Sequence, residues 1–438
     1  MATSIHKSLS ADALIQRLRQ RFDTLPDHRA GSITYPLGDV LLAAFAMFSL
    51  KEPSLLAFDE RRDRPNDNLR TVYRIEQIPC DSQMRSILDP LDPVHLRPAF
   101  TDVFRCLQRG KVLEDYAYLG GHYLISLDGT GYFSSSRIHC ESCLVKNHRN
   151  GTVTYSHHML GASLVHPDHQ EVFPLCPEPI IKADGDEKND CERNATRRWL
   201  KLFRQEHPRL PIIIIEDALA ANAPHIRDLQ EARAHYIIGV KWGDHTYLYR
   251  QVCEADVAGR TQALLEIDAE GTVHHFRFHH RLSLNESNLE ILVNVLEYWE
   301  ISSDGSMQYF SWITDWTLTP QTVWPVMRGG RARWKIENET FNTLKNQGYE
   351  FDRNFGHGKK HLSVVLALLM MLAFLVDQVQ QRCCPLFQAA RQSRRTKRSL
   401  WELMRMYFEM AVLSSMSELW LLLAGHNDCG PMPLRDTS

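Results

Sequence analysis

Three acidic residues from distant parts of the chain have surroundings that suit metal ligands. Asp128 follows the apolar run 124–127, and Asp217 comes shortly after the four isoleucines of 212–215. Each is predicted to end a β-strand, and open α/β sheets bind ligands at that edge. Glu337, the third acid, lies in a basic segment with a helix-compatible sequence. Carboxylates gathered among cations are what metal-assisted chemistry on a phosphate backbone requires.

Each of these acids also has an ordinary structural explanation. Asp128 and Asp217 could be turn or helix-cap residues, which are common after strands. Arg333 and Glu337, one turn apart on a predicted helix, could form a surface ion pair worth at most about 1 kcal/mol. Glu216 and Asp217 point to opposite faces of a strand, so only one of them can join a site. The catalytic interpretation therefore requires that the three segments meet.

The composition indicates a large, folded protein with reduced cysteines. At 438 residues the chain exceeds the usual size of one domain, so about two to four structural units are expected. The net charge of -3 means that any contact with nucleic acid must come from local basic patches. Ten cysteines in this length fit free thiols in a cytosol. The most apolar run, 364–376, is too short to span a bilayer and is predicted to be a buried helix.

The order of predicted elements indicates an α/β fold. Residues 9–110 are predicted to be helical, and the following segments alternate as three strands, helix, strand, helix, strand. This is the ribonuclease-H-like arrangement, a mixed sheet with helices on both faces. The predicted strands are 124–127, 159–166, 171–175, 212–215 and 236–240, and the helices between the later ones are 190–203 and 218–229.

A β-rich segment interrupts this core before a predicted long helix that carries Glu337. We read it as an inserted β subdomain, and the last part of the chain, 362–425, as helical again. The expected division is an N-terminal helical region (1–118), a first core part (119–242), the insertion (243–317), a second core part (318–360) and a C-terminal helical region (361–438).

Three segments of the chain resemble the catalytic segments of the DDE transposases of bacterial insertion sequences. They are Leu127-Asp128-Gly129, Ile215-Glu216-Asp217 and Arg333-Trp334-Lys335-Ile336-Glu337, and they look like the group with a β-rich insertion before the third acid. The resemblance covers nearly the whole chain. It implies a ribonuclease-H-like core in which Asp128, Asp217 and Glu337 bind two Mg²⁺ (or Mn²⁺) ions, cut transposon ends and join the freed 3′-hydroxyls to target DNA.

The same resemblance implies the partners of the chain. They are double-stranded DNA, at transposon ends and target, and a second copy of the chain in the DNA complex; a membrane is not among them. The N-terminal helices would recognise the ends and the C-terminal helices would dimerise. The expected location is the cytoplasm of a bacterium, at the nucleoid when the protein is active.

The third segment departs from the family at two positions. The family has a tyrosine, an arginine, the catalytic glutamate and a lysine at set spacings. Arg333 and Glu337 match, and the resemblance gives phosphate contacts to Arg333 and Lys345. Gly330 stands at the place of the tyrosine, and Lys345 lies one residue farther along than usual. Glu339 is therefore a rival for the third acid, although Glu337 keeps the spacing to the arginine.

A second candidate metal site comes from cysteine spacing. Cys140 and Cys143, followed by His148, His157 and His158, have the knuckle spacing of a zinc site. The adjacent histidines lack the compact spacing of a second ligand pair, so a reduced surface hairpin is the alternative.

Other functions remain open at this point. An inactive or co-opted copy would bind DNA without cutting it, and the missing tyrosine supports that alternative. A metal-dependent nuclease of the same fold would cut without strand transfer. A glycosidase using two of the carboxylates is disfavoured, because the cations of 328–360 and 391–398 suit phosphate better than sugar.

Overall fold

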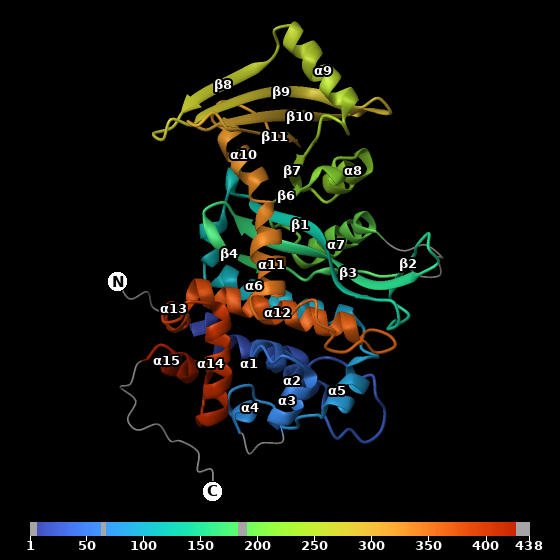
Figure 1. Cartoon of the computed structure of the whole chain (residues 1–438), viewed down its shortest axis with the longest axis vertical. Coiled ribbons are helices and arrows are strands. Elements are labelled where there is room, and N and C mark those ends of the chain that lie inside the picture. Colours follow the sequence, from blue (N-terminus) through green and yellow to red (C-terminus); the bar gives the residue numbers. More distant parts are fainter. Residues whose placement is uncertain (1–6, 63–66, 183–190, 426–438) are drawn as a thin grey trace.

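The computed structural model describes residues 7–62, 67–182 and 191–425 of the chain. The helices from the two ends of the chain gather at one end of the molecule, and the strands of residues 262–314 form the opposite end (Figure 1). The central strands lie between these two parts. The predicted flanking of a mixed α/β core by helical regions is therefore confirmed.

Five strands form the core of the sheet in the order β4-β3-β1-β6-β7. β1 pairs antiparallel with β3 and parallel with β6, and β6 pairs parallel with β7. This mixed order is the predicted ribonuclease-H-like arrangement. The strands are β1 (Tyr123–Ser135), β3 (Val153–His166), β4 (His169–Pro174), β6 (Ile212–Glu216) and β7 (His235–Gly239).

The apolar pattern explains the centre of this sheet. β6 lies between β1 and β7, and all five of its residues are buried. Continuous burial is typical of a parallel strand covered on both faces. Helix α7 (Glu192–Glu206) packs on β1 and β3, and helix α10 (Val323–Arg331) packs on β6 and β7. Two short strands that the sequence did not suggest, β2 (Leu144–Asn147) and β5 (Glu178–Ile180), also pair with β3.

The predicted β-rich insertion continues the core sheet. Its last strand pairs antiparallel with β7, so one sheet runs from the core into the insertion. A helix, α9, packs on β9 and was not predicted. The insertion comprises α9 (Thr246–Val257), β8 (Gln262–Ile267), β9 (Val273–Asn285), β10 (Asn288–Ile301) and β11 (Met307–Thr314).

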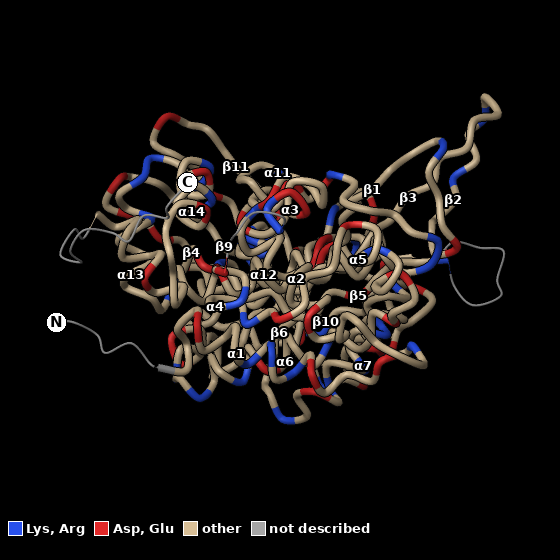
Figure 2. Tube along the Cα trace, turned by 90° about the horizontal axis from the view of Figure 1, so that it is seen from below, with Lys and Arg blue, Asp and Glu red and all other residues tan. Residues whose placement is uncertain are grey.

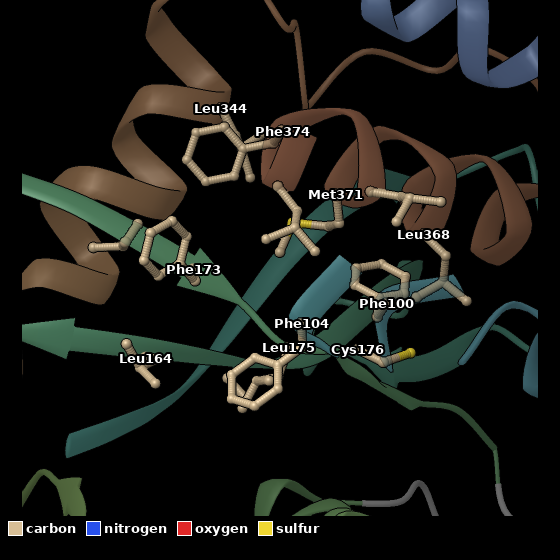
Figure 3. Packing of buried hydrophobic residues seen from close by; sticks show 14 of the residues in the cluster. Phe100, Phe104, Leu164, Phe173, Leu175, Cys176, Leu344, Leu368, Met371 and Phe374 are labelled. Atoms are coloured by element: carbon tan, nitrogen blue, oxygen red, sulfur yellow. The ribbon is translucent and has the colours of Figure 1, made fainter. Parts of the chain in front are cut away.

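Helix α12 (Leu362–Cys383) joins the sheet to the helical end of the molecule. It packs on α2 (Leu37–Ser49) and on β4, and Figure 3 shows Phe173 of β4 with Met371 and Phe374 of α12 in one apolar cluster. Burying each such side chain stabilises the fold by about 1.5–3 kcal/mol. The helix has 22 residues, longer than the run seen in the sequence, and is apolar enough to cross a membrane by length and composition. Its most apolar window is wholly buried in the protein, as predicted.

The other helices surround α2 and α12 at this end of the molecule (Figure 1). From the N-terminal region come α1 (Ala11–Phe22), α3 (Leu55–Arg62), α4 (Asn68–Thr71), α5 (Asp81–Leu88) and α6 (Arg97–Arg109). From the C-terminal region come α13 (Pro385–Gln392), α14 (Lys397–Met410) and α15 (Met416–Leu423).

A buried charge ties the N-terminal region to α12 and α14. The Lys51 ammonium donates to the Asp377 carboxylate, which also accepts from the Tyr349 hydroxyl at 2.5 Å. The same ammonium lies 4.2 Å from the centre of the Trp401 ring. Burial lowers the pKa of Lys51, and the charge of Asp377 opposes that shift. Lys51 therefore depends on Asp377 to keep its charge in this buried position.

Removing Asp377 should destabilise the protein strongly. Asp377→Ala leaves a buried ammonium without its counter-charge, which costs about 3–5 kcal/mol in comparable pairs. We expect a lower thermal unfolding temperature than in Glu254→Ala, a matched change of an exposed acid on α9. Equal unfolding temperatures in the two variants would contradict this description of the pair.

Candidate active site

Asp128 and Asp217 lie at neighbouring positions of the sheet. The parallel pairing of β1 with β6 ends at Ser126 and Ile215, and the two aspartates follow two residues later on each strand. Both line one cavity of about 450 Å³. Asp217 follows the end of β6 as predicted, and Asp128 lies beside it where β1 has left its pairing with β6.

The sequence suggested that Asp128 ends its strand, and this prediction is wrong. β1 continues to Ser135, because its antiparallel pairing with β3 runs on from Asp128 opposite Gly161 to Ser135 opposite Tyr155. The Asp-Gly pair that resembled a turn lies inside a long hairpin. Asp128 thus lies within a strand that pairs with β3 at this position, and it is not a turn residue.

Asp217 combines the two roles that the sequence left open. Its Oδ1 accepts a hydrogen bond of 2.9 Å from the amide of Leu219 and so caps a short 3₁₀ turn. The residue is exposed and lines the cavity with Asp128. Capping engages one carboxylate oxygen and leaves the residue at the cavity surface.

Glu216 is excluded from the role of Asp217. Its Oε2 lies 2.5 Å from Nε2 of His225, and both side chains are buried. The charge and the hydrogen bond of Glu216 raise the pKa of His225, although burial of the imidazole acts in the opposite direction. Both acids line the cavity, but Glu216 is buried against His225 whereas Asp217 is exposed.

The segment that carries Glu337 is not the long α-helix that we predicted. Helix α10 ends at Arg331, a π-helical turn spans Ile336–Phe341, and a short helix, α11 (Asn342–Asn346), follows. π-Helical turns are rare and frequently occur at functional sites. The Arg333–Glu337 contact survives this break, with Nη1 2.6 Å from Oε1.

A glycine lets this segment approach Asp128. Gly161 lies opposite Asp128 on β3, and a Cβ atom at this position would meet the Phe341 ring at 2.6 Å. Two hydrogen bonds fix the approach. Ser126 donates to the carbonyl oxygen of Arg333 at 3.1 Å, and the hydroxyls of Ser163 and Thr340 lie 3.1 Å apart. The π-helical turn is thereby seated across β1 and β3.

The electrostatics of Asp128 show which acids it meets. Burial and the charges of Glu337, Glu192 and Asp217 together raise its pKa to about 7, while Arg333 acts in the opposite direction. A carboxyl held near other carboxylates in a partly dry site resists ionisation. The charges of Glu337 and Asp217 therefore both act on Asp128, although Glu337 is not among the residues that line the cavity with the two aspartates.

Glu339, the rival third acid, faces another part of the molecule. Its charge acts on Lys397 of α14, where it opposes the lowering of the lysine pKa by burial. Glu337, two residues earlier, acts on Asp128 instead. The π-helical turn thus directs the two glutamates to different neighbours.

Glu192 is an acid of the cavity that we did not predict. It begins α7, lines the cavity with both aspartates, and its carboxyl lies against Gly129, where a Cβ atom would meet Oε1 at 2.1 Å. Partial burial of the carboxyl, Asp217 and Glu216 raise its pKa. In the sequence it looked like an ordinary acid in the first turn of a helix; the preceding residues, 183–190, lie outside the described part.

Lys345 lies near the cavity through His158. Burial first, and then the charges of His157 and Lys345, lower the pKa of His158, which lines the cavity. Lys345 also forms an ion pair with Asp352 at 3.6 Å. The extra residue of spacing does not remove the lysine from this region.

Some of the cations of the two basic runs form ion pairs with acids of the described residues. Arg331 bonds to Glu300 at 2.5 Å, and Arg328 pairs with Asp168. In the second run Lys397 is largely buried, and Arg398 lies 3.5 Å from Glu350. Figure 2 shows Lys and Arg interspersed with Asp and Glu over the molecule in that view. Contact with a phosphate backbone must therefore be local.

Close packing explains why a glycine, and not the tyrosine of the family, stands at position 330. A Cβ atom at this position would lie 2.4 Å from Nε1 of Trp312, a buried side chain on β11. The indole of the insertion fills the space that a larger residue would need. The departure from the family pattern is thus coupled to the strand next to β7.

Comparison with known proteins identifies the class. Residues 175–375 match the family model described as "Transposase DDE domain". Residues 175–375 therefore carry a transposase DDE domain, and this match supports a DNA transposase of the DDE type, a class of enzyme that generally uses divalent metal ions. The match includes Asp217 and Glu337, whereas Asp128 lies upstream of it.

The other two comparisons concern curated proteins and solved structures. The search of curated proteins found no match. A solved piggyBac transposase synaptic complex with hairpin DNA is similar at 12% identity and a TM-score of 0.36, with 97% of this chain and 81% of that chain covered.

Divalent metal binding at this site should depend on pH. A carboxyl with a pKa of about 7 is protonated below that pH and must lose its proton to bind a cation. We expect the Mg²⁺ affinity, measured by titration calorimetry, to rise by up to about tenfold per pH unit until the pH reaches about 7, and to level off above it. The slope should be absent in Asp128→Asn, and a pH-independent affinity of the unsubstituted protein would contradict the prediction.

The packing of Gly330 also has a measurable consequence. An alanine normally stabilises a helix by about 1 kcal/mol relative to glycine. Gly330→Ala should instead destabilise the protein by about 1–3 kcal/mol, because overpacking against Trp312 forces a shift. Gly243→Ala, at a position with open space around the added Cβ atom, is the matched control in thermal unfolding. A stabilised Gly330→Ala variant would refute the close packing.

Proposed function

We propose that this transposase cuts transposon ends and joins them to target DNA with two Mg²⁺ (or Mn²⁺) ions held by Asp128, Asp217 and Glu337. The observation that carries the proposal is the environment of Asp128, on which the charges of Glu337 and Asp217 act although the three residues come from distant segments. We further propose that the chain is a bacterial insertion-sequence protein that acts in the cytoplasm and at the nucleoid.

The donor set suits these ions. Carboxylate oxygens on a partly open surface are the ligands that Mg²⁺ prefers, since it keeps waters and binds substrate phosphate. A cation among these acids would also offset the repulsion that raises the pKa of Asp128. When bound, such ions activate the attacking oxygen and stabilise the leaving oxygen.

Two cations of the chain would hold the DNA backbone. Arg333 is mostly buried and bonds to Glu337, so its guanidinium is already oriented beside the proposed ligand. An arginine in this position offers a second pair of donors to a phosphate. Lys345, near His158, would contact phosphate on the other side of the cavity. The exposed Trp334, 54% accessible, offers an aromatic surface next to Arg333.

Glu337 is the better candidate for the third ligand than Glu339. Only Glu337 acts on Asp128, whereas Glu339 acts on Lys397. Its bond to Arg333 does not oppose this role, because a carboxylate has two oxygens and accepts several partners.

The remaining regions would bind DNA and a second copy of the chain. We propose that the helices of 1–118 recognise double-stranded transposon ends, that the core of 119–242 and 318–360, with the insertion of 243–317, performs the chemistry, and that 361–438 supports a homodimer in the DNA complex. The joining of both helical regions by Lys51 and Asp377 favours transmission of end binding to the core.

Substitution of the three acids tests the proposal. Asp128→Asn, Asp217→Asn and Glu337→Gln should each lower Mg²⁺-dependent cleavage of end DNA by about a thousandfold or more, since a metal ion contributes several kcal/mol to the transition state. Binding of end DNA, measured by gel shift, should persist in all three.

Glu339→Gln is the matched control, because it changes a glutamate of the same turn. Full cleavage by Glu337→Gln with loss in Glu339→Gln would reverse the assignment. Cleavage without joining of the 3′-hydroxyl to a target would favour a nuclease. Binding by the unsubstituted protein without any cleavage would favour an inactive or co-opted copy.

A further inference from the structure

A second cluster of metal-ligating side chains lies outside the acidic cavity. Cys140 and Cys143 come from the turn before β2, His157 from β3, and His357 from the loop before α12. One ligand atom from each residue lies within 4.8 Å of the others. Three of the four residues are buried.

Four of the six distances between the ligand atoms match the edges of a tetrahedron, and the other two are at most 4.8 Å. The two sulfurs are 3.8 Å apart, and Nε2 of His157 lies 3.3 Å from Cys140 Sγ and 3.5 Å from Cys143 Sγ. Nε2 of His357 lies 3.4 Å from Cys143 Sγ. Tetrahedral zinc, with bonds of about 2.3 Å to sulfur and about 2.0–2.1 Å to nitrogen, places its ligands roughly 3.4–3.8 Å apart.

Hydrogen bonding alone explains this cluster poorly. The Nε2 atoms of His157 and His357 face sulfur, which is a weak donor and a weak acceptor. Buried polar groups left in this state cost free energy. A dication bound by two thiolates would satisfy both Nε2 atoms and balance the charge of both sulfurs.

The structure also corrects the ligand set that the sequence suggested. His148 is engaged by Thr154, with Nε2 2.8 Å from the hydroxyl, and His158 lines the acidic cavity. Of the three histidines near the cysteines, only His157 joins the cluster. Its fourth member, His357, is separated from Cys143 by 214 positions, so spacing along the chain could not indicate it.

We propose that Cys140, Cys143, His157 and His357 bind one structural Zn²⁺ ion. Two thiolates and two imidazoles in tetrahedral array favour zinc over magnesium, calcium or manganese. Four protein ligands close the coordination sphere, which indicates a structural and not a catalytic ion.

The ion would join the segment between β1 and β2, together with β3, to the loop that leads into α12. The same two segments already meet through Glu141, whose amide donates to the Lys359 carbonyl at 3.1 Å, and through Ser142, which donates to the Lys360 carbonyl at 3.1 Å. Asp89 accepts from the amides of Lys359 and Lys360 and fixes the loop from the other side. These hydrogen bonds therefore fix the segments that carry the cysteines and His357 beside each other.

The zinc ion would affect the enzyme by fixing the position of β3 beside the acidic cavity. His157 is adjacent to His158, which lines the acidic cavity, and both lie on the strand that pairs with β1 beside Asp128. An ion at His157 would fix this part of β3 and connect it to the helical end of the molecule. Zinc would thus support the cavity without contacting its carboxylates.

Metal analysis of the full chain tests the proposal. Protein purified under reducing conditions should contain one zinc per chain by mass spectrometry. Cys143→Ser and His357→Ala should lose it, and His357→Cys should retain it, because a thiolate can replace the imidazole. His148→Ala is the matched control and should keep the zinc. Replacement by Co²⁺ should give the visible spectrum of a tetrahedral thiolate site in the unsubstituted protein.

Three results would overturn the site. They are the absence of zinc and of cobalt binding in the unsubstituted protein, full zinc content in His357→Ala, or a Cys140–Cys143 disulfide in the reduced preparation. The measurement uses neither DNA nor Mg²⁺. A protein without zinc that still cleaves DNA would refute this site alone, and a zinc-loaded protein whose acid variants keep cleavage would refute the proposed catalysis alone.

Discussion

Repulsion between carboxylates is the constraint on which the centre of this molecule depends. Asp128 meets the negative charges of Glu337, Glu192 and Asp217 in a partly buried position, and its pKa rises to about 7. Such groups do not assemble spontaneously, so packing elsewhere must hold them. Two contacts supply that restraint. The π-helical turn packs on Gly161, and Ser126 donates a hydrogen bond to the backbone of the same segment. A cation would relieve the repulsion that the fold imposes.

Strand β3 connects most of the parts of this arrangement. It provides Gly161 opposite Asp128, contacts the π-helical turn through Ser163, and carries His158 at the cavity and His157 at the cysteine cluster. Its partner β4 packs on α12, whose Asp377 binds the N-terminal region. A displacement of β3 would therefore affect the acids, the proposed zinc ion and the helical end together.

The sheet could be predicted from the sequence because its signals are local. Four consecutive isoleucines identify a buried strand wherever they occur, and the order of strands and helices followed from such runs. The details of the site could not be predicted from the sequence, because they depend on contacts between distant segments. The π-helical turn follows from the approach of Phe341 to Gly161, β1 continues past Asp128 only through its pairing with β3, and His357 reaches the cysteines through the loop before α12. Glu192 carried no signal beyond an acid at the start of a helix.

The central claim is that Asp128, Asp217 and Glu337 together hold the ions of the reaction. Anomalous diffraction from crystals of the protein with bound end DNA and Mn²⁺ tests it most directly, because it places the metal without reference to activity. We predict two manganese peaks between these three carboxylates, with Glu339 making no contact. Peaks coordinated by Glu339, or confined to acids other than Asp128 and Asp217, would contradict the account.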